Sequence, residues 1–201
     1  MAEESGRYRT ILMFGQPGSG KGTQGKVLGS LPGFYHLSCG DVFRSLDPES
    51  ELGKTFLEYS SQGKLVPDNF TVQLWLEHVH GLVHTGAFKP EEEVLILDGI
   101  PRNRNQAEEM EAHIDVILLV CLDAANQEDL VARMRRRALH ENRLDDANVD
   151  VIRQRFSEYA AETEPVLSYY PKERIQTVDG GLSPIGVLQG VVEVTRKVLE
   201  P

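Results

Sequence analysis

Cysteine is scarce in this 201-residue sequence, which contains only Cys39 and Cys121, far apart along the chain. They form neither a C-x-x-C pair nor the cysteine quartet of a zinc-binding module, so neither a disulfide framework nor a structural zinc site is expected. Reduced thiols are typical of proteins that work in a reducing compartment. We therefore expect a cytoplasmic protein without zinc.

The sequence also lacks an apolar run of the roughly 18 residues that a membrane-spanning helix requires. Its opening segment, MAEESGRYRT, has neither the positive flank nor the apolar centre of a secretory signal. Basic residues are outnumbered, with 21 Lys and Arg against 31 Asp and Glu, and the formal net charge is −10. This charge disfavours binding to nucleic acid or to an anionic membrane, so any anionic ligand must be held by a local basic cluster.

Short apolar runs are what the chain does contain. Hydrophobic residues make up 40% of the sequence, which is enough to bury the core of a single domain spanning residues 1–201. Strands that are buried on both faces of a parallel sheet have this short apolar form. The runs are YRTILMFG (8–15), VLILDG (94–99), DVILLVCL (115–122) and RIQTVDG (174–180).

Longer stretches between these runs have helical spacing. One contains Val72, Leu76, Val79 and Val83, and another contains Ile152, Phe156, Tyr159 and Thr163. Strands alternating with helices predict an α/β fold with three layers, in which a doubly wound parallel sheet of about five strands has helices on both faces. Residues 38–67 and 134–147 break this rhythm, and we expect them to be excursions from the ligand-binding end of the sheet.

GQPGSGKGTQ, residues 15–24, is a glycine-rich segment directly after the first apolar run. Backbone N–H groups of such a loop converge on an anion, and a helix predicted to begin near Lys21 adds the partial positive charge of its N-terminus. The match to G-x-x-x-x-G-K is complete from Gly15 to Lys21, although Gly22 stands where the full pattern has Ser or Thr. The segment therefore predicts a phosphate-binding loop.

GQPGSGKGT resembles the phosphate loop of adenylate kinases and related nucleoside monophosphate kinases, which also have Gly-Thr after the lysine. The resemblance covers nearly the whole chain. It continues through HLSCGDVFR (36–44), GKLVPD (63–68), LDGIPRNRNQAE (97–108), the arginine-rich segment from Arg133, and RLDD (143–146).

This resemblance implies a P-loop nucleotide kinase fold and reversible phosphoryl transfer from Mg-ATP to AMP, giving two ADP, by a monomer. Residues 38–67 would then bind the monophosphate, and 134–147 would form a short lid. Asp98, at the end of a predicted strand, would contact Mg²⁺ through water. The implied ATP-binding residues are Gly15, Pro17, Gly18, Ser19, Gly20, Lys21, Gly22, Thr23, Arg133 and Arg137.

The acceptor would be held by arginines that follow two turns. Arg44 and Arg102 have the planar guanidinium that suits phosphate oxygens, and Gln106 has an amide that can both donate to and accept from adenine. Cys39 departs from the family, which usually has Thr at this position. Because a thiol is a weaker hydrogen-bond donor and acceptor than a hydroxyl, Cys39 predicts a lower affinity for the acceptor or a less strict selection of its base. The implied AMP-binding residues are Cys39, Arg44, Leu65, Val66, Gly99, Arg102, Gln106, Arg143 and Arg155.

The implied lid contributes further arginines to the transferring phosphoryl group. Arg133 and Arg137 are four residues apart and share one face of a helix, whereas Arg135 and Arg136 lie on other faces and are expected in solvent. Arg143 follows a short connection, ALHEN (138–142), which lacks the family's glycines and predicts a stiffer lid. The implied catalytic residues are Lys21, Arg102, Arg133, Arg137, Arg143 and Arg155.

One position and the function itself leave alternatives open. One extra residue separates Arg143 from Arg155 relative to the family, so Arg153 is the alternative to Arg155. The function has alternatives as well: a kinase for another or a relaxed acceptor such as UMP or CMP, or a non-catalytic module that senses adenine nucleotides.

His80 and His84 have the i, i+4 spacing of a metal pair, but we expect them on a solvent-exposed helix face.

Overall fold

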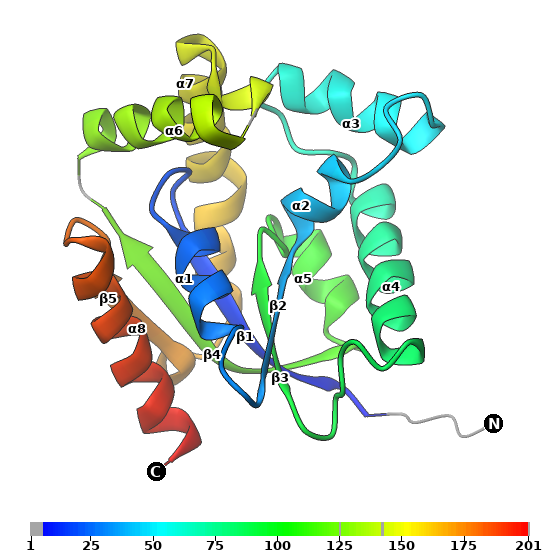
Figure 1. The fold of residues 1–201 in the computed structure, drawn as a ribbon, viewed down its shortest axis with the longest axis vertical. Helices are drawn as coiled ribbons and strands as arrows, with labels where there is room; N and C mark the ends of the chain where they lie inside the picture. The colour runs from blue at the N-terminus through cyan, green and yellow to red at the C-terminus, as the bar shows by residue number, and fades with distance from the viewer. Residues whose placement is uncertain (1–5, 125, 142, 201) are drawn as a thin grey trace.

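A parallel sheet forms the centre of the molecule. The computed structural model describes residues 6–124, 126–141 and 143–200, and within them the sheet has five strands in the order β2-β3-β1-β4-β5. Every neighbouring pair runs parallel, which confirms the predicted α/β fold (Figure 1). The strands are β1 (Tyr8–Gly15), β2 (Phe34–Ser38), β3 (Val94–Asp98), β4 (Ile114–Asp123) and β5 (Ile175–Asp179).

β2 is the strand that the apolar runs did not reveal. Its sequence FYHLS is short, and only Leu37 within it is buried, because the strand lies at the edge of the sheet beside β3. An edge strand needs no continuous apolar run, since only one neighbour and part of each face cover it. The other four strands lie within one or two residues of the predicted runs.

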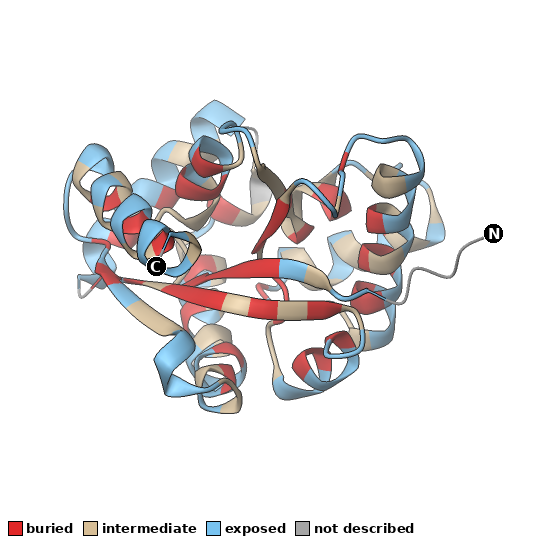
Figure 2. Ribbon diagram, turned by 90° about the horizontal axis from the view of Figure 1, so that it is seen from below, coloured by how far each residue is buried: buried red, intermediate tan, exposed pale blue. Residues whose placement is uncertain are grey.

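Helices cover both faces of the sheet, as Figure 2 shows from below. Alternate residues of a strand point to opposite faces, so Ile11 of β1 packs in one apolar cluster and Leu12 in another. The Ile11 cluster includes residues of α1 (Lys21–Leu28) and α8 (Pro184–Leu199). The Leu12 cluster includes residues of α4 (Asp68–His84) and α5 (Arg104–Met110).

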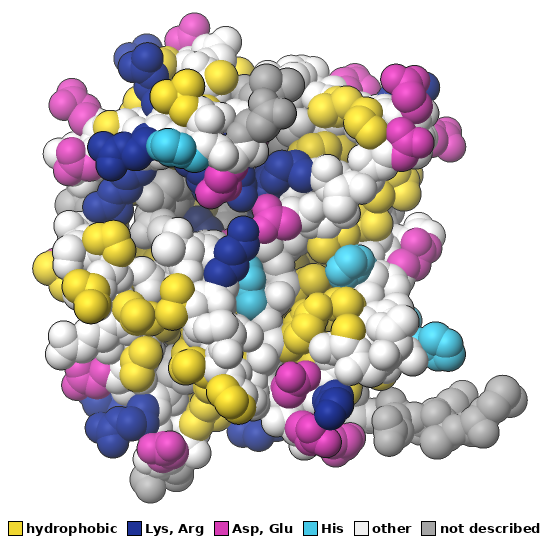
Figure 3. Space-filling view, viewed as in Figure 1, with side chains coloured by type: hydrophobic (Ala, Val, Ile, Leu, Met, Phe, Trp, Pro, Cys, Tyr) yellow, Lys and Arg dark blue, Asp and Glu magenta, His cyan; other side chains and the backbone are white. Residues whose placement is uncertain are grey.

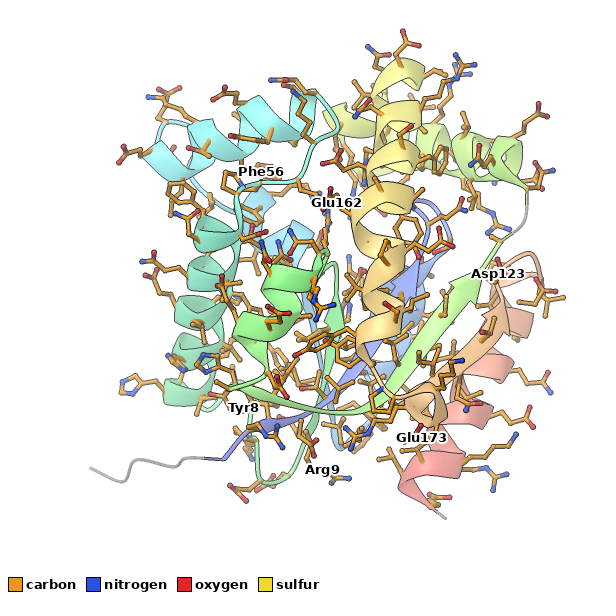
Figure 4. The ribbon with its side chains drawn as sticks, turned by 180° about the vertical axis from the view of Figure 1, so that it is seen from behind. Tyr8, Arg9, Phe56, Asp123, Glu162 and Glu173 are labelled. Carbon is orange, nitrogen blue, oxygen red and sulfur yellow. The ribbon has the colours of Figure 1, made fainter. Side chains whose placement is uncertain are left out.

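The remaining helical segments connect or overhang these layers. Figure 1 shows α3, α6 and α7 above the end of the sheet at which β4 finishes, and Figure 4 shows from behind that Tyr8 and Asp123 lie toward opposite ends of it. The segments are α2 (Cys39–Arg44), α3 (Glu51–Ser61), α6 (Gln127–Glu141), α7 (Val149–Glu158), the 3-10 turns Leu144–Asp146, Glu164–Tyr169 and Lys172–Arg174, and the π-helix Tyr159–Thr163.

Two local predictions need correction. The connection expected after Arg137 is helical as far as Glu141, because ALHE contains no residue that ends a helix, and only Asn142 of that segment lies outside the described residues. The apolar stripe that begins at Ile152 faces inward as expected, but the α-helix gives way to a π-helix at Tyr159. No helix in the described part of the chain combines the length and apolarity needed to cross a bilayer.

Candidate active site

The glycine-rich loop connects β1 to α1 at the carboxyl edge of the sheet. Gly15 has φ 136°, and a Cβ there would lie 2.5 Å from the carbonyl oxygen of Leu122, so only glycine fits. Gly20 has φ 102° and precedes α1 without giving it a side-chain cap. The first-turn N–H groups of α1 therefore have no side-chain acceptor from its cap and remain available to an anion.

Lys21 folds back over the loop. Its Nζ donates to the carbonyl oxygens of Gly15, at 2.6 Å, and Gln16, at 3.0 Å. Burial lowers the pKa of Lys21 to about 8, with further lowering by Arg102, Arg137 and Arg155, whereas Asp98 acts in the opposite direction. Because the positive charge of Lys21 is repelled by those of the three arginines, a bound polyanion would reduce the repulsion among all four side chains. This arrangement therefore favours polyanion binding.

A cleft opens beside the loop, and we call it the loop cleft. Asp98, at the end of β3, lies in it next to Gly22, where an added Cβ would come within 3.1 Å of the carboxylate. The predicted ATP-binding residues, apart from Gly15, thus line one cleft together with Arg143 and Arg155. Its lining includes Pro17, Gly18, Ser19, Gly20, Lys21, Gly22, Thr23, Gln24, Asp98, Arg133, Arg136, Arg137, His140, Arg143, Leu182, Pro184 and Val187.

A second cleft, the inner cleft, contains the predicted acceptor residues except Arg143. Cys39 is 3% exposed there, and burial raises the pKa of its thiol to about 11, so the thiol stays protonated at neutral pH. The lining combines apolar walls with a few polar groups, as in many small-molecule sites. It includes Gly15, Cys39, Phe43, Arg44, Phe56, Gly63, Leu65, Val66, Gly99, Arg102, Gln106, Asp145, Arg155 and Tyr159.

The two clefts meet at a shared basic border. Lys21, Arg44, Arg102 and Arg155 line both. Figure 3 shows Lys and Arg side chains gathered around the hollow below α6 in that view. Two anionic ligands bound in the two clefts would therefore bring their phosphates to the same cations.

Two neighbouring aspartates, one of them fully buried, hold Arg137 and Arg155 in place. Arg137 contacts Asp146, with N–O distances of 2.6 and 2.7 Å, and Asp146 is fully buried. Arg155 donates to Asp145 at 2.8 Å and also to Asp146. The RLDD segment thus supplies carboxylates that fix these guanidinium groups, a role that sequence reasoning did not assign to it.

The position of Arg155 bears on the question left open by the extra residue. Its side chain is 18% exposed and lies on the border of both clefts. The side chain of Arg153 is 74% exposed and lies 3.8 Å from the carboxylate of Asp150. The geometry therefore brings Arg155, and not Arg153, to the site.

Asp41 of α2 is another residue that sequence reasoning missed. Its Oδ1 accepts from Arg44 at 2.7 Å and from Arg143 at 3.1 Å, and Lys26 lies 3.3 Å from its Oδ2. These cations lower the pKa of Asp41, although burial acts against them. Arg143 consequently lies on the loop cleft beside α2 and does not line the inner cleft.

The other lid arginines differ in their surroundings. Arg133 donates to the carbonyl oxygen of Gly180 at 3.0 Å, in the turn after β5. Arg135 and Arg136 are exposed, as predicted, although Arg136 also borders the loop cleft. His80 and His84 are both exposed, which confirms that this pair lies on a solvent-exposed helix face.

A comparison with protein-family models shows to which family this chain is related. The model described as adenylate kinase matches residues 13–175, from the end of β1 to the start of β5. The chain belongs to the adenylate kinase family. The matched range includes the glycine-rich loop, the residues that line the inner cleft, and the arginines from Arg133 to Arg155.

Curated adenylate kinases resemble the chain over nearly its full length. It is 34% identical to the adenylate kinase of Flavobacterium psychrophilum over 197 residues, covering 94% of this chain and 96% of that protein. It is 34% identical to that of Thermobifida fusca over 194 residues, covering 94% and 95%. It is 36% identical to that of Porphyromonas gingivalis over 173 residues, covering 82% and 84%.

Proposed function

We propose that the protein is an ATP:AMP phosphotransferase that converts Mg-ATP and AMP reversibly into two ADP. The observation that carries this function is the common border of the clefts, where Lys21, Arg102 and Arg155 face both. Membership of the adenylate kinase family supports the same reaction. The loop cleft would hold ATP, and the inner cleft would hold AMP.

Electrostatics and alignment supply the catalysis in this proposal. Phosphoryl transfer passes through a loose transition state with charge spread over the equatorial oxygens, so cations placed between donor and acceptor lower the barrier. Lys21, Arg102 and the lid arginines occupy this position. No side-chain base is required, because the acceptor is already an ionised phosphate. We infer that residues 38–67 and 134–147 close over the nucleotides and exclude water.

Magnesium fits the donor side of the site. Mg²⁺ binds one or two carboxylates together with substrate phosphates and retains several waters. Asp98 offers one carboxylate beside the loop, and Thr23 adds a hydroxyl nearby. The described residues contain no group of three or more His, Cys, Asp or Glu side chains placed to hold a metal, so phosphates would provide much of the coordination. When bound, the ion would neutralise phosphate charge.

A panel of acceptors tests the proposed function. We expect kcat/KM, measured with ATP and Mg²⁺ in a coupled assay, to be higher for AMP than for UMP, CMP, GMP or dAMP. A clear preference for UMP or CMP would assign the protein to another branch of the monophosphate kinases. Tight ATP binding in calorimetry without turnover of any acceptor would indicate a nucleotide sensor instead, although retention of the complete arginine set argues against that.

Cys39 provides a second test of the acceptor site. We expect Cys39→Thr to lower the KM for AMP by about threefold to tenfold, because a hydroxyl makes a stronger hydrogen bond than a thiol and one such bond contributes roughly 0.5–1.5 kcal/mol. Cys121→Thr is the matched control, since Cys121 lies on β4 and is not among the described residues that line either cleft. An unchanged KM in the Cys39 variant would remove this position from acceptor recognition.

We also propose that the protein works as a monomer in the cytoplasm, without nucleic acid or membrane partners. Its two cysteines are both free thiols, and its formal net charge of −10 is unfavourable for anionic surfaces. The basic groups concentrate at the clefts, where the nucleotides supply the opposite charge.

A further inference from the structure

A closed hydrogen-bond network lies behind the inner cleft. Asp68, the first residue of α4, accepts from the side-chain amides of Asn103, at 2.7 Å, and Gln106, at 2.8 Å, on the same oxygen Oδ1. Asn103, the N-cap of α5, accepts from the backbone N–H of Gln106 at 2.9 Å. The side chains of Asp68, Asn103 and Gln106, together with the backbone N–H of Gln106, therefore form a ring that joins the starts of two helices.

This network determines which way the Gln106 amide points. Its Oε1 accepts from the backbone N–H of Arg102 at 2.7 Å, while its Nε2 donates to Asp68. A flipped amide would place Nε2 against the N–H of Arg102 and Oε1 against a carboxylate. The amide nitrogen would then face the N–H of Arg102, donor against donor, and the amide oxygen would face the carboxylate of Asp68, acceptor against acceptor. Both contacts would be repulsive, so the flipped orientation is unfavourable.

The remaining hydrogen-bonding capacity of Gln106 is what a ligand in the inner cleft can use. Gln106 is 1% exposed and lines that cleft. An amide nitrogen carries two hydrogens and an amide oxygen has two lone pairs, so one donor and one acceptor remain after the internal bonds. Their order across the amide is set by the same network.

That order distinguishes purine bases. Adenine presents the N6 amino donor beside a ring-nitrogen acceptor, whereas hypoxanthine and guanine present a carbonyl acceptor at position 6 beside the N1–H donor. An amide held with Oε1 toward the amino group and Nε2 toward the ring nitrogen suits adenine. The flipped amide would suit a 6-oxopurine.

We propose that Asp68 is a positioning residue that sets acceptor selectivity for adenine over 6-oxopurines by fixing the orientation of the Gln106 amide. This inference rests on the proposed function, in which Gln106 contacts the acceptor base. Asp68 is not among the described residues that line the inner cleft, and in this proposal it acts on the nucleotide through Gln106. Its carboxylate is suited to this task because it only accepts hydrogen bonds and has no flipped form that donates.

Asp68→Ala is the variant that tests the proposal, with Asp68→Asn as its conservative partner. Ala removes the acceptor, whereas the Asn oxygen can still receive both donors. Asn69→Ala is a matched control at an exposed position in the same helical turn. For each variant, kcat and KM are measured with AMP and with IMP, and circular dichroism checks the fold.

We expect Asp68→Ala to reduce the ratio of kcat/KM for AMP to that for IMP by about tenfold, the effect of losing one hydrogen bond to a charged group. The change should lie mainly in the KM for AMP. Asp68→Asn should restore most of the ratio, and Asn69→Ala should leave it unchanged. A merely structural role would lower activity with both nucleotides and leave the ratio constant, and that result would overturn the proposal.

Asn103→Asp keeps the test decisive if Asp68→Ala does not fold. Asp retains an oxygen that caps α5 through the N–H of Gln106, but it replaces the donor to Asp68 with a second carboxylate that repels it. We expect the same loss of AMP-to-IMP selectivity, and an unchanged ratio would again contradict the proposal. The wild-type protein separates the two hypotheses, because absence of AMP turnover would reject the proposed function itself.

Discussion

Lys21→Met is expected to leave the fold intact and to lower turnover of ATP and AMP by about 10³-fold, the scale seen when a cation or donor that stabilises a transition state is removed. Lys21 lies where the two clefts meet, and its Nζ donates to the carbonyl oxygens of Gly15 and Gln16, which water can reach once the ammonium group is gone. The measurement is kcat with saturating Mg-ATP and AMP, together with a thermal melt.

Lys54→Met is the control for this prediction. Lys54 lies on α3 with its side chain 62% exposed, and its Nζ forms an ion pair with Glu49, at 3.3 Å. Its replacement should leave kcat unchanged within about twofold, because exposed ion pairs contribute little. Near-normal turnover of Lys21→Met would remove Lys21 from the mechanism.

The same lysine predicts how stability depends on pH. Burial lowers the pKa of Lys21 in the folded protein from its ordinary value of 10.5 to about 8. Between these values the unfolded chain binds more protons than the folded one, so the contribution of Lys21 to the free energy of unfolding rises with pH in that range. At pH 7 the folded state carries an unfavourable buried charge. Lys21→Met should therefore be at least as stable as the wild type without nucleotide, and a lower melting temperature would contradict this.

Arg155→Met is expected to lower turnover by about 10³-fold as well, since arginines that contact the transferring phosphoryl group have effects of this size. Unlike the lysine variant, it should also destabilise the protein, because Asp145 and the buried Asp146 lose a partner. The loss should be about 1–3 kcal/mol, which is less than for an isolated buried pair, because Arg137 still contacts Asp146. Urea denaturation measures this difference.

Arg153→Met gives the matched comparison two residues earlier on α7. Its guanidinium is 74% exposed, so we expect unchanged turnover and a change in stability within about 0.5 kcal/mol. If Arg153→Met lost activity and Arg155→Met retained it, the placement of Arg155 at the clefts would be wrong. Loss of stability without loss of activity in Arg155→Met would reduce that residue to a structural partner of the aspartates.

Local patterns explain why most of the fold could be predicted. The run 8–15 followed by glycines and Lys21 contains the strand, the loop and the start of α1 in consecutive positions, so no distant contact is needed to recognise them. β2 carried no such pattern, because its place at the sheet edge leaves it half buried. The helical continuation through ALHE was missed because spacing relative to a known family suggested a loop where intrinsic propensity favoured a helix.

The site was predictable only in part, because some of its contacts join segments that are far apart in the sequence. Arg44 and Arg102 follow recognisable turns, but some of the carboxylates that hold polar side chains of the site come from distant segments of the chain. Asp41 meets Arg143 across 102 positions, and Asp68 meets Gln106 across 38. Such pairs depend on how α2, α4 and α5 pack at one edge of the sheet. A single sequence contains no signal of that packing.

The fate of the terminal phosphoryl group of ATP tests the two-nucleotide site most directly. The measurement mixes the protein and Mg²⁺ with AMP and ATP labelled in its γ-phosphate, and then separates the products. The shared border of Lys21, Arg102 and Arg155 predicts that the label appears as the β-phosphate of ADP formed from AMP. Label that remains in ATP, or that appears only as inorganic phosphate, would contradict the account.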